Sequence, residues 1–101
     1  MVNQSVFNIL DKVFYSITVT LPKTTLLIVG NSVGYFMCAA LDVELFDSKP
    51  HLQERKVVCG RAMGVKTIEE LINAPLQAVS LAATEKGITT GMLVKGALLL
   101  L

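Results

Sequence analysis

The first half of the chain consists of short apolar or alternating segments separated by turn residues. Residues 6–10 form an apolar run, and Asp11-Lys12 after it is typical of a tight turn. From Val13 to Thr20 the chain is rich in β-branched residues and alternates with a period of two. This pattern predicts a strand with one face buried in a sheet.

Two fully apolar segments follow this strand. Residues 26–29 predict a central strand and residues 34–41 predict a further one, with Gly30-Asn31-Ser32 as the turn between them. The links are too short to hold crossover helices, so we expect the first four strands to form an antiparallel meander. Residues 56–61 return to strand character and predict a fifth strand.

Residues with capping properties predict where the first helices begin. Asp42 is typical of a helix N-cap, and we expect the short helix after it to end or restart at Pro50. Thr67 and Glu70 have the spacing of a capping box, which predicts a helix that runs to about Ile72.

The last third of the chain predicts two more helices and completes the fold class. Pro75 suits the first position of a helix that continues to Lys86, and residues 91–101 predict a terminal helix. Strands come first and helices last, which predicts an α+β fold. We expect a single antiparallel sheet of about five strands with helices packed on one face, a two-layer sandwich. The 101 residues suit one domain spanning 1–101.

The composition indicates association. Hydrophobic residues make up 52% of the chain and charged residues only 17%, against a usual charged share of ~25%. In a small domain the surplus apolar side chains reach the surface, where contiguous apolar area indicates a partner. The four leucines of 98–101 cannot all face one core from a helix. A homo-oligomer is therefore expected.

Charge and cysteine content limit the expected partners and the expected cellular compartment. The net charge is +1 and Lys and Arg form no cluster, which argues against a nucleic-acid partner. The longest charge-free stretch, 24–41, is broken by Gly30 and Gly34, so a membrane partner is not expected. The N-terminus lacks the features of a signal peptide, and Cys38 and Cys59 are expected to be reduced thiols in the cytoplasm.

Two glycine-containing segments resemble catalytic or anion-binding motifs. Gly30 to Gly34 matches G-x-S-x-G around Ser32, but a strand follows it, so we interpret it as a hairpin turn. The 60–67 loop leads into a helix start and carries Arg61 and Lys66, which suits a small anionic ligand. The competing interpretation is that Thr67 and Glu70 satisfy the helix end themselves and that Arg61 pairs with an acid such as Asp42.

The thiols and one lysine offer a second kind of chemistry. A reactive cysteine needs an electropositive, partly exposed setting, and Cys59 lies two residues from Arg61, whereas buried structural thiols are commoner. Lys23 would need burial to act as a nucleophile, and an exposed loop lysine is the simpler reading. One histidine and no C-x-x-C pair make a zinc site unexpected, and no cofactor is expected.

Several segments together resemble the YunC-like family of small bacterial and archaeal proteins, which is classed as a domain of unknown function. The similarity rests on 21–24, 34–43, 59–71, the Ala74-Pro75-Leu76 step and the tail from Gly87 to Met92. The resemblance implies a compact α+β fold and an intracellular setting, and no established activity. It directs attention to a set of positions that are candidates for ligand binding: Lys23, Cys38, Asp42, Arg61, Lys66 and Thr67.

Three functional hypotheses remain open at this point. The first is a non-catalytic, homo-oligomeric binding or interaction module, favoured by the apolar excess. The second is a small enzyme whose polar site is formed by Lys23, Cys38, Asp42 and Arg61 at one end of the sheet. The third is an anion-binding regulator that uses the 60–67 loop.

Overall fold

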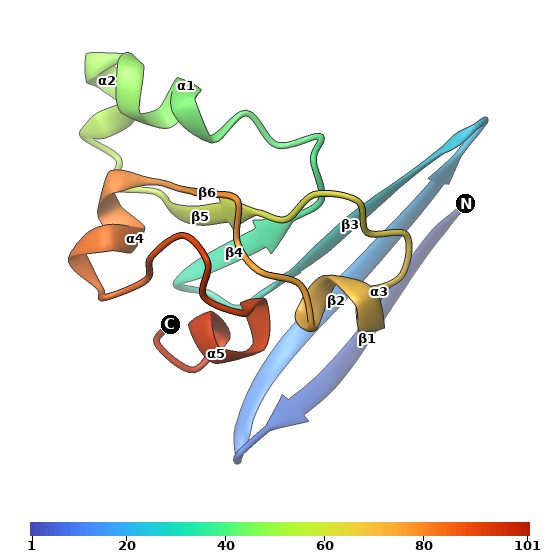
Figure 1. Cartoon of the computed structure of the whole chain (residues 1–101). Helices are drawn as coiled ribbons and strands as arrows, with labels where there is room; N and C mark the ends of the chain where they lie inside the picture. Colours follow the sequence, from blue (N-terminus) through green and yellow to red (C-terminus); the bar gives the residue numbers. More distant parts are fainter.

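The sheet is built from neighbouring segments of the chain. The computed structural model describes residues 1–101, apart from the side chains of residues 52 and 53. The strand order follows the sequence, with β1 (Val2–Ile9), β2 (Lys12–Leu21), β3 (Thr24–Gly30), β4 (Gly34–Met37), β5 (Val58–Arg61) and β6 (Ala78–Val79). The helices are short: α1 (Val43–Ser48), α2 (Pro50–Gln53), α3 (Ile68–Ile72), α4 (Leu81–Glu85) and α5 (Val94–Leu98). The expected α+β class is confirmed (Figure 1).

The first four strands form the expected antiparallel meander. The first turn lies one residue earlier than predicted, because Leu10 and Asp11 adopt positive φ angles of 46° and 69° and Lys12 already belongs to β2. The β3–β4 link is a hairpin turn, in which the Asn31 side-chain oxygen accepts the Val33 N–H at 2.8 Å. The interpretation of this G-x-S-x-G segment as a turn is confirmed.

The expected single antiparallel sheet of about five strands is wrong, because the sheet has six strands and is mixed. β5 pairs with β4 in parallel. The chain between them holds α1 and α2, and these helices return it to the end of the sheet where β4 began (Figure 1). A crossover of this length permits the parallel pairing that a tight hairpin forbids.

The helix expected from Pro75 to Lys86 is wrong in its first half. Residues 78–79 form β6 on the edge of β5, and the Gln77 N–H donates to the Arg61 carbonyl at 2.8 Å. The helix begins only at Leu81. Hydrogen bonds to the open edge of β5 outweigh the weak local preference that proline and alanine give for a helix start.

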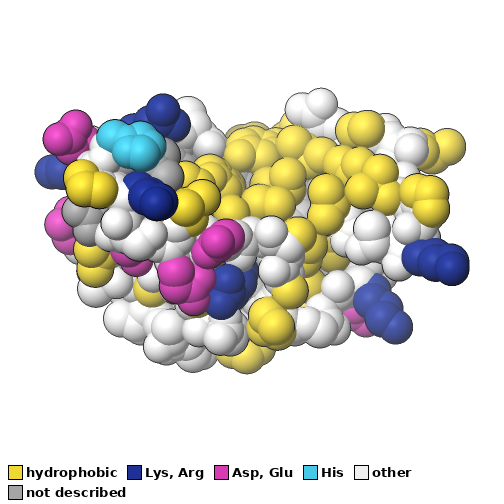
Figure 2. All heavy atoms as spheres, turned by 90° about the horizontal axis from the view of Figure 1, so that it is seen from above, with side chains coloured by type: hydrophobic (Ala, Val, Ile, Leu, Met, Phe, Trp, Pro, Cys, Tyr) yellow, Lys and Arg dark blue, Asp and Glu magenta, His cyan; other side chains and the backbone are white. Residues whose placement is uncertain are grey.

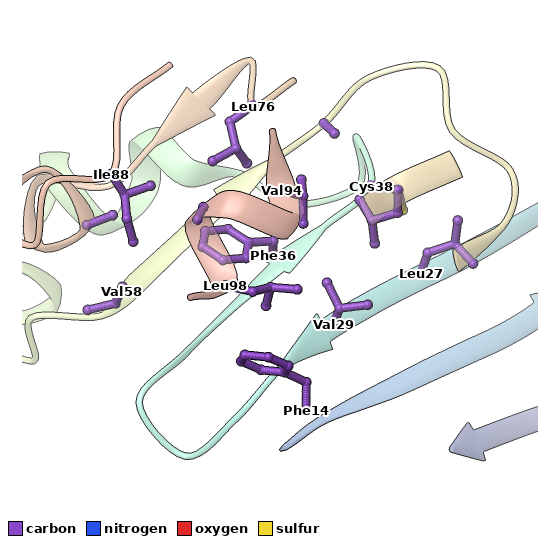
Figure 3. Packing of buried hydrophobic residues seen from close by; sticks show 14 residues of the cluster. Phe14, Leu27, Val29, Phe36, Cys38, Val58, Leu76, Ile88, Val94 and Leu98 are labelled. Carbon is purple, nitrogen blue, oxygen red and sulfur yellow. The ribbon is translucent and has the colours of Figure 1, made fainter. Parts of the chain in front are cut away.

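The core lies between one face of the sheet and α3, α4 and α5 (Figure 3). Its strand and helix members are apolar side chains that are almost fully buried. The set includes Phe14, Leu27, Val29 and Phe36 from the sheet and Leu71, Ala83, Val94 and Leu98 from the helices.

The C-terminal leucines pack differently from the expected helix over 91–101. α5 ends at Leu98, which is buried, and the chain then turns so that Leu101 also packs against the core. The Lys12 ammonium donates to the Leu99 carbonyl at 2.9 Å and holds this end beside the sheet. Leu100 alone of the four is exposed, at 42%. The last leucines therefore serve mainly this chain's own core.

The two faces of the sheet are covered unequally. α3, α4 and α5 lie on one side, while α1 and α2 lie on the other side near β5 (Figure 1). The expectation that all helices pack on one face is therefore wrong. In β2 the buried residues are Phe14 and Ser16, so the alternate set that begins with Val13 points away from the core.

Candidate functional site

Arg61 is the centre of a polar cluster at the end of β5. Its guanidinium donates to both carboxylate oxygens of Glu44 at 3.0 and 3.1 Å. It also donates to the Leu41 carbonyl at 3.0 Å and to the Gln77 side chain at 2.8 Å. These four hydrogen bonds connect β5 to the chain before α1, to α1 itself and to the segment before β6. Arg61 therefore stabilises the packing of these segments against one another.

Asp42 lies beside this cluster and caps α1, as predicted. Its carboxylate accepts the Leu45 N–H at 3.2 Å. Arg61 pairs with Glu44 rather than with Asp42. The pKa of the Glu44 carboxyl is lowered, first by a hydrogen bond from its own backbone N–H and then by the charge of Arg61. The anionic form of Glu44 thus suits the ion pair with Arg61.

Lys23 and Lys66 lie at a different place, on a hollow of about 470 Å³. Lys23 occupies the β2–β3 turn with a positive φ of 63°, and Lys66 lies in the loop between β5 and α3. Both line the same hollow, although they come from separate segments. Two of the predicted ligand-binding residues are therefore brought together by the fold.

Thr67 and Glu70 satisfy the start of α3 themselves. The Thr67 hydroxyl accepts the Glu70 N–H at 3.1 Å, and the Glu70 carboxylate accepts the Lys66 N–H at 2.7 Å. The reach of Glu70 is one residue further back than in a standard capping box. The N-terminus of α3 is thus occupied by protein groups.

Cys38 and Cys59 are both free thiols and both are buried. The Cys38 thiol lies 3.9 Å from the carbonyl of Thr25, a residue that lines the hollow beside Lys23. Burial raises the pKa of the Cys59 thiol to about 11, and the negative charge of Asp47 adds to this shift. Cys59 is therefore kept protonated at neutral pH.

The predicted site residues thus fall into two groups. Asp42 and Arg61 belong to the cluster around α1, whereas Lys23 and Lys66 share the hollow near Cys38. Sequence reasoning missed Glu44 and Gln77, because nothing in their spacing indicates that they meet Arg61 across the crossover. In the part of the chain that the structure describes, no group of three His, Cys, Asp or Glu side chains is placed to hold a metal ion.

A second candidate site is the side of β1 to β4 that α3, α4 and α5 do not cover. We call it the open face, and it consists of alternate residues in 2–8, 13–21, 24–28 and 35–37. Along these described strands it carries no charged side chain. Several members are well exposed, among them Val2 at 67%, Val6 at 66% and Val13 at 57%. Figure 2 shows a broad hydrophobic surface with most of the charged side chains toward the end that carries α1 and α2, and a few more at the opposite edge.

The centre of the open face is formed by pairs of apolar residues on neighbouring strands. Ile17 lies opposite Ile28, and Val19 lies opposite Leu26. Tyr15 and Tyr35 lie on either side of Gly30, where an added Cβ would come within 2.8 Å of the Tyr35 Cβ. Partial burial raises the pKa of both tyrosine hydroxyls. The face is thus uncharged at neutral pH. The alternation of β2 was the one signal that could have revealed it.

The fold and these sites define a class of small α+β proteins with a six-stranded mixed sheet, one face of which is left largely open. Among the described residues, none of the helices has both the length and the apolar character that crossing a membrane requires.

Comparison with known proteins agrees with this architecture. Residues 37–101 match the family described as "Domain of unknown function (DUF1805)", and the chain belongs to this family. The chain is 48% identical to "Uncharacterized protein YunC" of Bacillus subtilis (strain 168) over 99 residues, which cover 98% of this chain and 96% of that protein. The resemblance to the YunC-like family drawn from the sequence is thereby confirmed.

A solved structure shows the same fold. The crystal structure of a protein of unknown function, TA1206 from Thermoplasma acidophilum, superposes with a TM-score of 0.82 at 27% sequence identity. The match covers 95% of this chain and 88% of that one. The mixed sheet and its short helices are therefore shared with a distant relative.

Proposed function

We propose that this protein is a homodimeric interaction module of the cytoplasm, in which two copies meet through the open faces of their sheets. The observation that carries the proposal is the uncharged, apolar and largely uncovered side of β1 to β4 (Figure 2). The free, buried thiols of Cys38 and Cys59 suit the reducing setting of the cytoplasm.

The size of the open face suits a dimer interface. With strands ~4.8 Å apart and a rise of ~3.3 Å per residue, four strands of this length present roughly 500 Å² in projection. Side chains that project from a sheet expose more area than its projection does. A standard protein interface buries ~800 Å² on each partner. The open face is therefore of the order that a stable dimer needs.

Its chemistry favours a second copy of the same chain as the occupant. In an isologous contact the same surface of both copies is buried, and a charge close to the two-fold axis would meet its own copy. The open face has none along the described strands, and its centre consists of Ile17, Ile28 and their neighbours. Two such sheets can stack ~10 Å apart, as in β-sandwiches, with the charged residues near α1 at the rim.

The proposed dimer contact does not involve the C-terminal leucines, on which the expectation from the sequence was based. Leu98 and Leu101 pack against the chain's own core, so the apolar excess of the sequence reaches the surface on β1 and β2 instead. A dimer built on the open face would leave Leu100 outside the contact.

Size-exclusion chromatography with light scattering tests the proposal. The wild-type protein should have twice the 10.9 kDa of one chain at micromolar concentration. Ile17→Lys places a charge at the centre of the open face and should give a monomer with an unchanged circular dichroism spectrum. Val6→Lys, at a more exposed position of the same face, repeats the test should Ile17→Lys not fold.

The matched control is Leu100→Lys, which adds the same charge at an exposed leucine outside the open face and should leave the dimer intact. A monomeric wild-type protein, or a dimer that survives both open-face substitutions, would overturn the proposal. So would a wild-type protein that binds lipid vesicles but does not self-associate.

The other two hypotheses have narrower support. Arg61 already makes four hydrogen bonds, and Thr67 and Glu70 occupy the start of α3, so an anion at the 60–67 loop would depend on Lys66. An enzyme built on Lys23, Cys38, Asp42 and Arg61 would have to join the two separate groups of residues. The interaction module needs no such rearrangement.

A further inference from the structure

We infer that the hollow between the β2–β3 turn and the β5–α3 loop is a binding site for a small dianion, held by Lys23 and Lys66. This site goes beyond the proposed dimer contact: it lies at the end of β2 and β3, where Leu21 and Thr24 also belong to the edge of the open face, and its two lysines lie outside that face. The hollow has a volume of about 470 Å³, and six residues line it: Leu21, Lys23, Thr24, Thr25, Val65 and Lys66.

The charges around the hollow are of one sign. Two lysines and no carboxylate line it. Within the described residues, neither the Lys23 nor the Lys66 ammonium group forms a hydrogen bond or an ion pair with the protein. The nearby Glu70 carboxylate is engaged by the Lys66 backbone N–H at 2.7 Å and does not line the hollow. The fold thus brings two cations to one cavity and leaves both without a counterion from the chain.

Lys23 lies in the tight turn between β2 and β3. Its φ of 63° lies in the left-handed region, which residues other than glycine adopt at a cost. The turn places Lys23 among the residues that line the hollow, together with Lys66.

The remaining walls define the class of ligand. Thr24 and Thr25 point to opposite faces of β3, so one threonine hydroxyl is available to donate to an oxyanion, and Leu21 and Val65 provide apolar surface. The volume lies in the range of small-molecule sites, ~300–1,000 Å³. Two lysines match two negative charges, so the ligand is a small dianion of the phosphate or dicarboxylate type with room for a short apolar group.

Isothermal titration calorimetry of the full chain at low ionic strength tests the site, with inorganic phosphate and succinate as the probes. At least one probe should bind saturably, with one site per chain. Lys23→Gln and Lys66→Gln should each weaken that binding about tenfold, because each removes one charge-assisted contact. Binding should also weaken as salt is added, because the two ammonium groups are exposed to solvent.

Lys86→Gln is the matched control, since Lys86 is an exposed lysine at the end of α4 that does not line the hollow. It should bind the probes like the wild type. The inference is overturned if neither probe binds saturably, or if both hollow variants bind as tightly as Lys86→Gln. The Ile17→Lys variant should retain anion binding and the lysine variants should retain the dimer, so the two proposals fail independently.

Discussion

The Arg61 guanidinium and the Glu44 carboxylate form a two-point contact, with hydrogen bonds of 3.0 and 3.1 Å. The pair joins the last residue of β5 to the first turn of α1, the helix that begins the crossover between β4 and β5. The Arg61 side chain is only 18% exposed, whereas Glu44 is 65% exposed. The arginine is therefore the member of the pair whose contacts are shielded from water.

Arg61→Ala should lower the free energy of unfolding by about 1–2 kcal/mol, because it removes four hydrogen bonds of a partly shielded cation. Urea unfolding followed by circular dichroism measures this change. Glu44→Gln should cost less, because the Leu41 and Gln77 contacts of Arg61 remain. Equal losses for the two variants would mean that the ion pair alone carries the effect of Arg61.

Ser80 is the buried polar residue that connects β5 to α4. Its hydroxyl donates to the Val57 carbonyl at 2.6 Å and accepts the backbone N–H groups of Cys59 and Ala83 at 3.2 and 3.3 Å. Ser80→Ala should cost about 2 kcal/mol of unfolding free energy, because it leaves buried donors and a carbonyl without a partner. Urea unfolding provides the measurement.

Thr67→Ala is the matched control for Ser80→Ala. Thr67 caps α3 in the same way, but it is exposed, so water can replace its hydroxyl. Its loss should cost about 1 kcal/mol. A cost for Ser80→Ala no greater than that for Thr67→Ala would contradict the role assigned to the buried network.

The Cys59 thiol should make the protein less stable at alkaline pH. Its pKa is raised from 9.0 to about 11 in the folded chain, chiefly by burial. Above pH 9.0 the unfolded chain releases the thiol proton while the folded chain retains it, so the stabilisation is complete below that pH and is lost as the pH rises toward about 11. Urea unfolding at a series of pH values should show this loss.

Cys59→Ala separates the thiol from the lysines and tyrosines that titrate in the same range. The unfolding free energy of the wild type should fall relative to that of Cys59→Ala as the pH rises from 9.0 to about 11. A difference that stays constant across this range would rule out the thiol as the cause. Iodoacetamide should also leave Cys59 unlabelled in the folded protein at neutral pH.

The sequence predicted the elements that local patterns specify. The alternation after Val13 and the apolar run at 26–29 identified β2 and β3, and the capping residues Asp42 and Thr67 identified the starts of α1 and α3. The helix predicted from the sequence over residues 75–80 was wrong, because β6 exists only through hydrogen bonds to β5. No pattern within six residues can report a partner strand that lies elsewhere in the chain.

The candidate sites, too, could be predicted only in part from the sequence. Sequence reasoning named Lys23 and Lys66 separately, and only the fold places them on one hollow. It paired Arg61 with an acid such as Asp42, but the partner is Glu44, because the first turn of α1 lies against β5. Asp42 and Glu44 are only two residues apart, and their positions in space decide which of them meets Arg61.

By itself, the sequence determined the α+β class, the family, the early antiparallel strands and an apolar content too large for one small core. These follow from periodicity, capping and composition, which act within a few residues or over the whole chain at once. Only the tertiary structure decided that β5 runs parallel to β4, that β6 closes the edge, and that the surplus apolar side chains lie on the open face rather than at the C-terminus. Those outcomes depend on which surfaces the crossover brings together, because hydrogen bonds and apolar burial act between neighbours in space, whatever their separation along the chain.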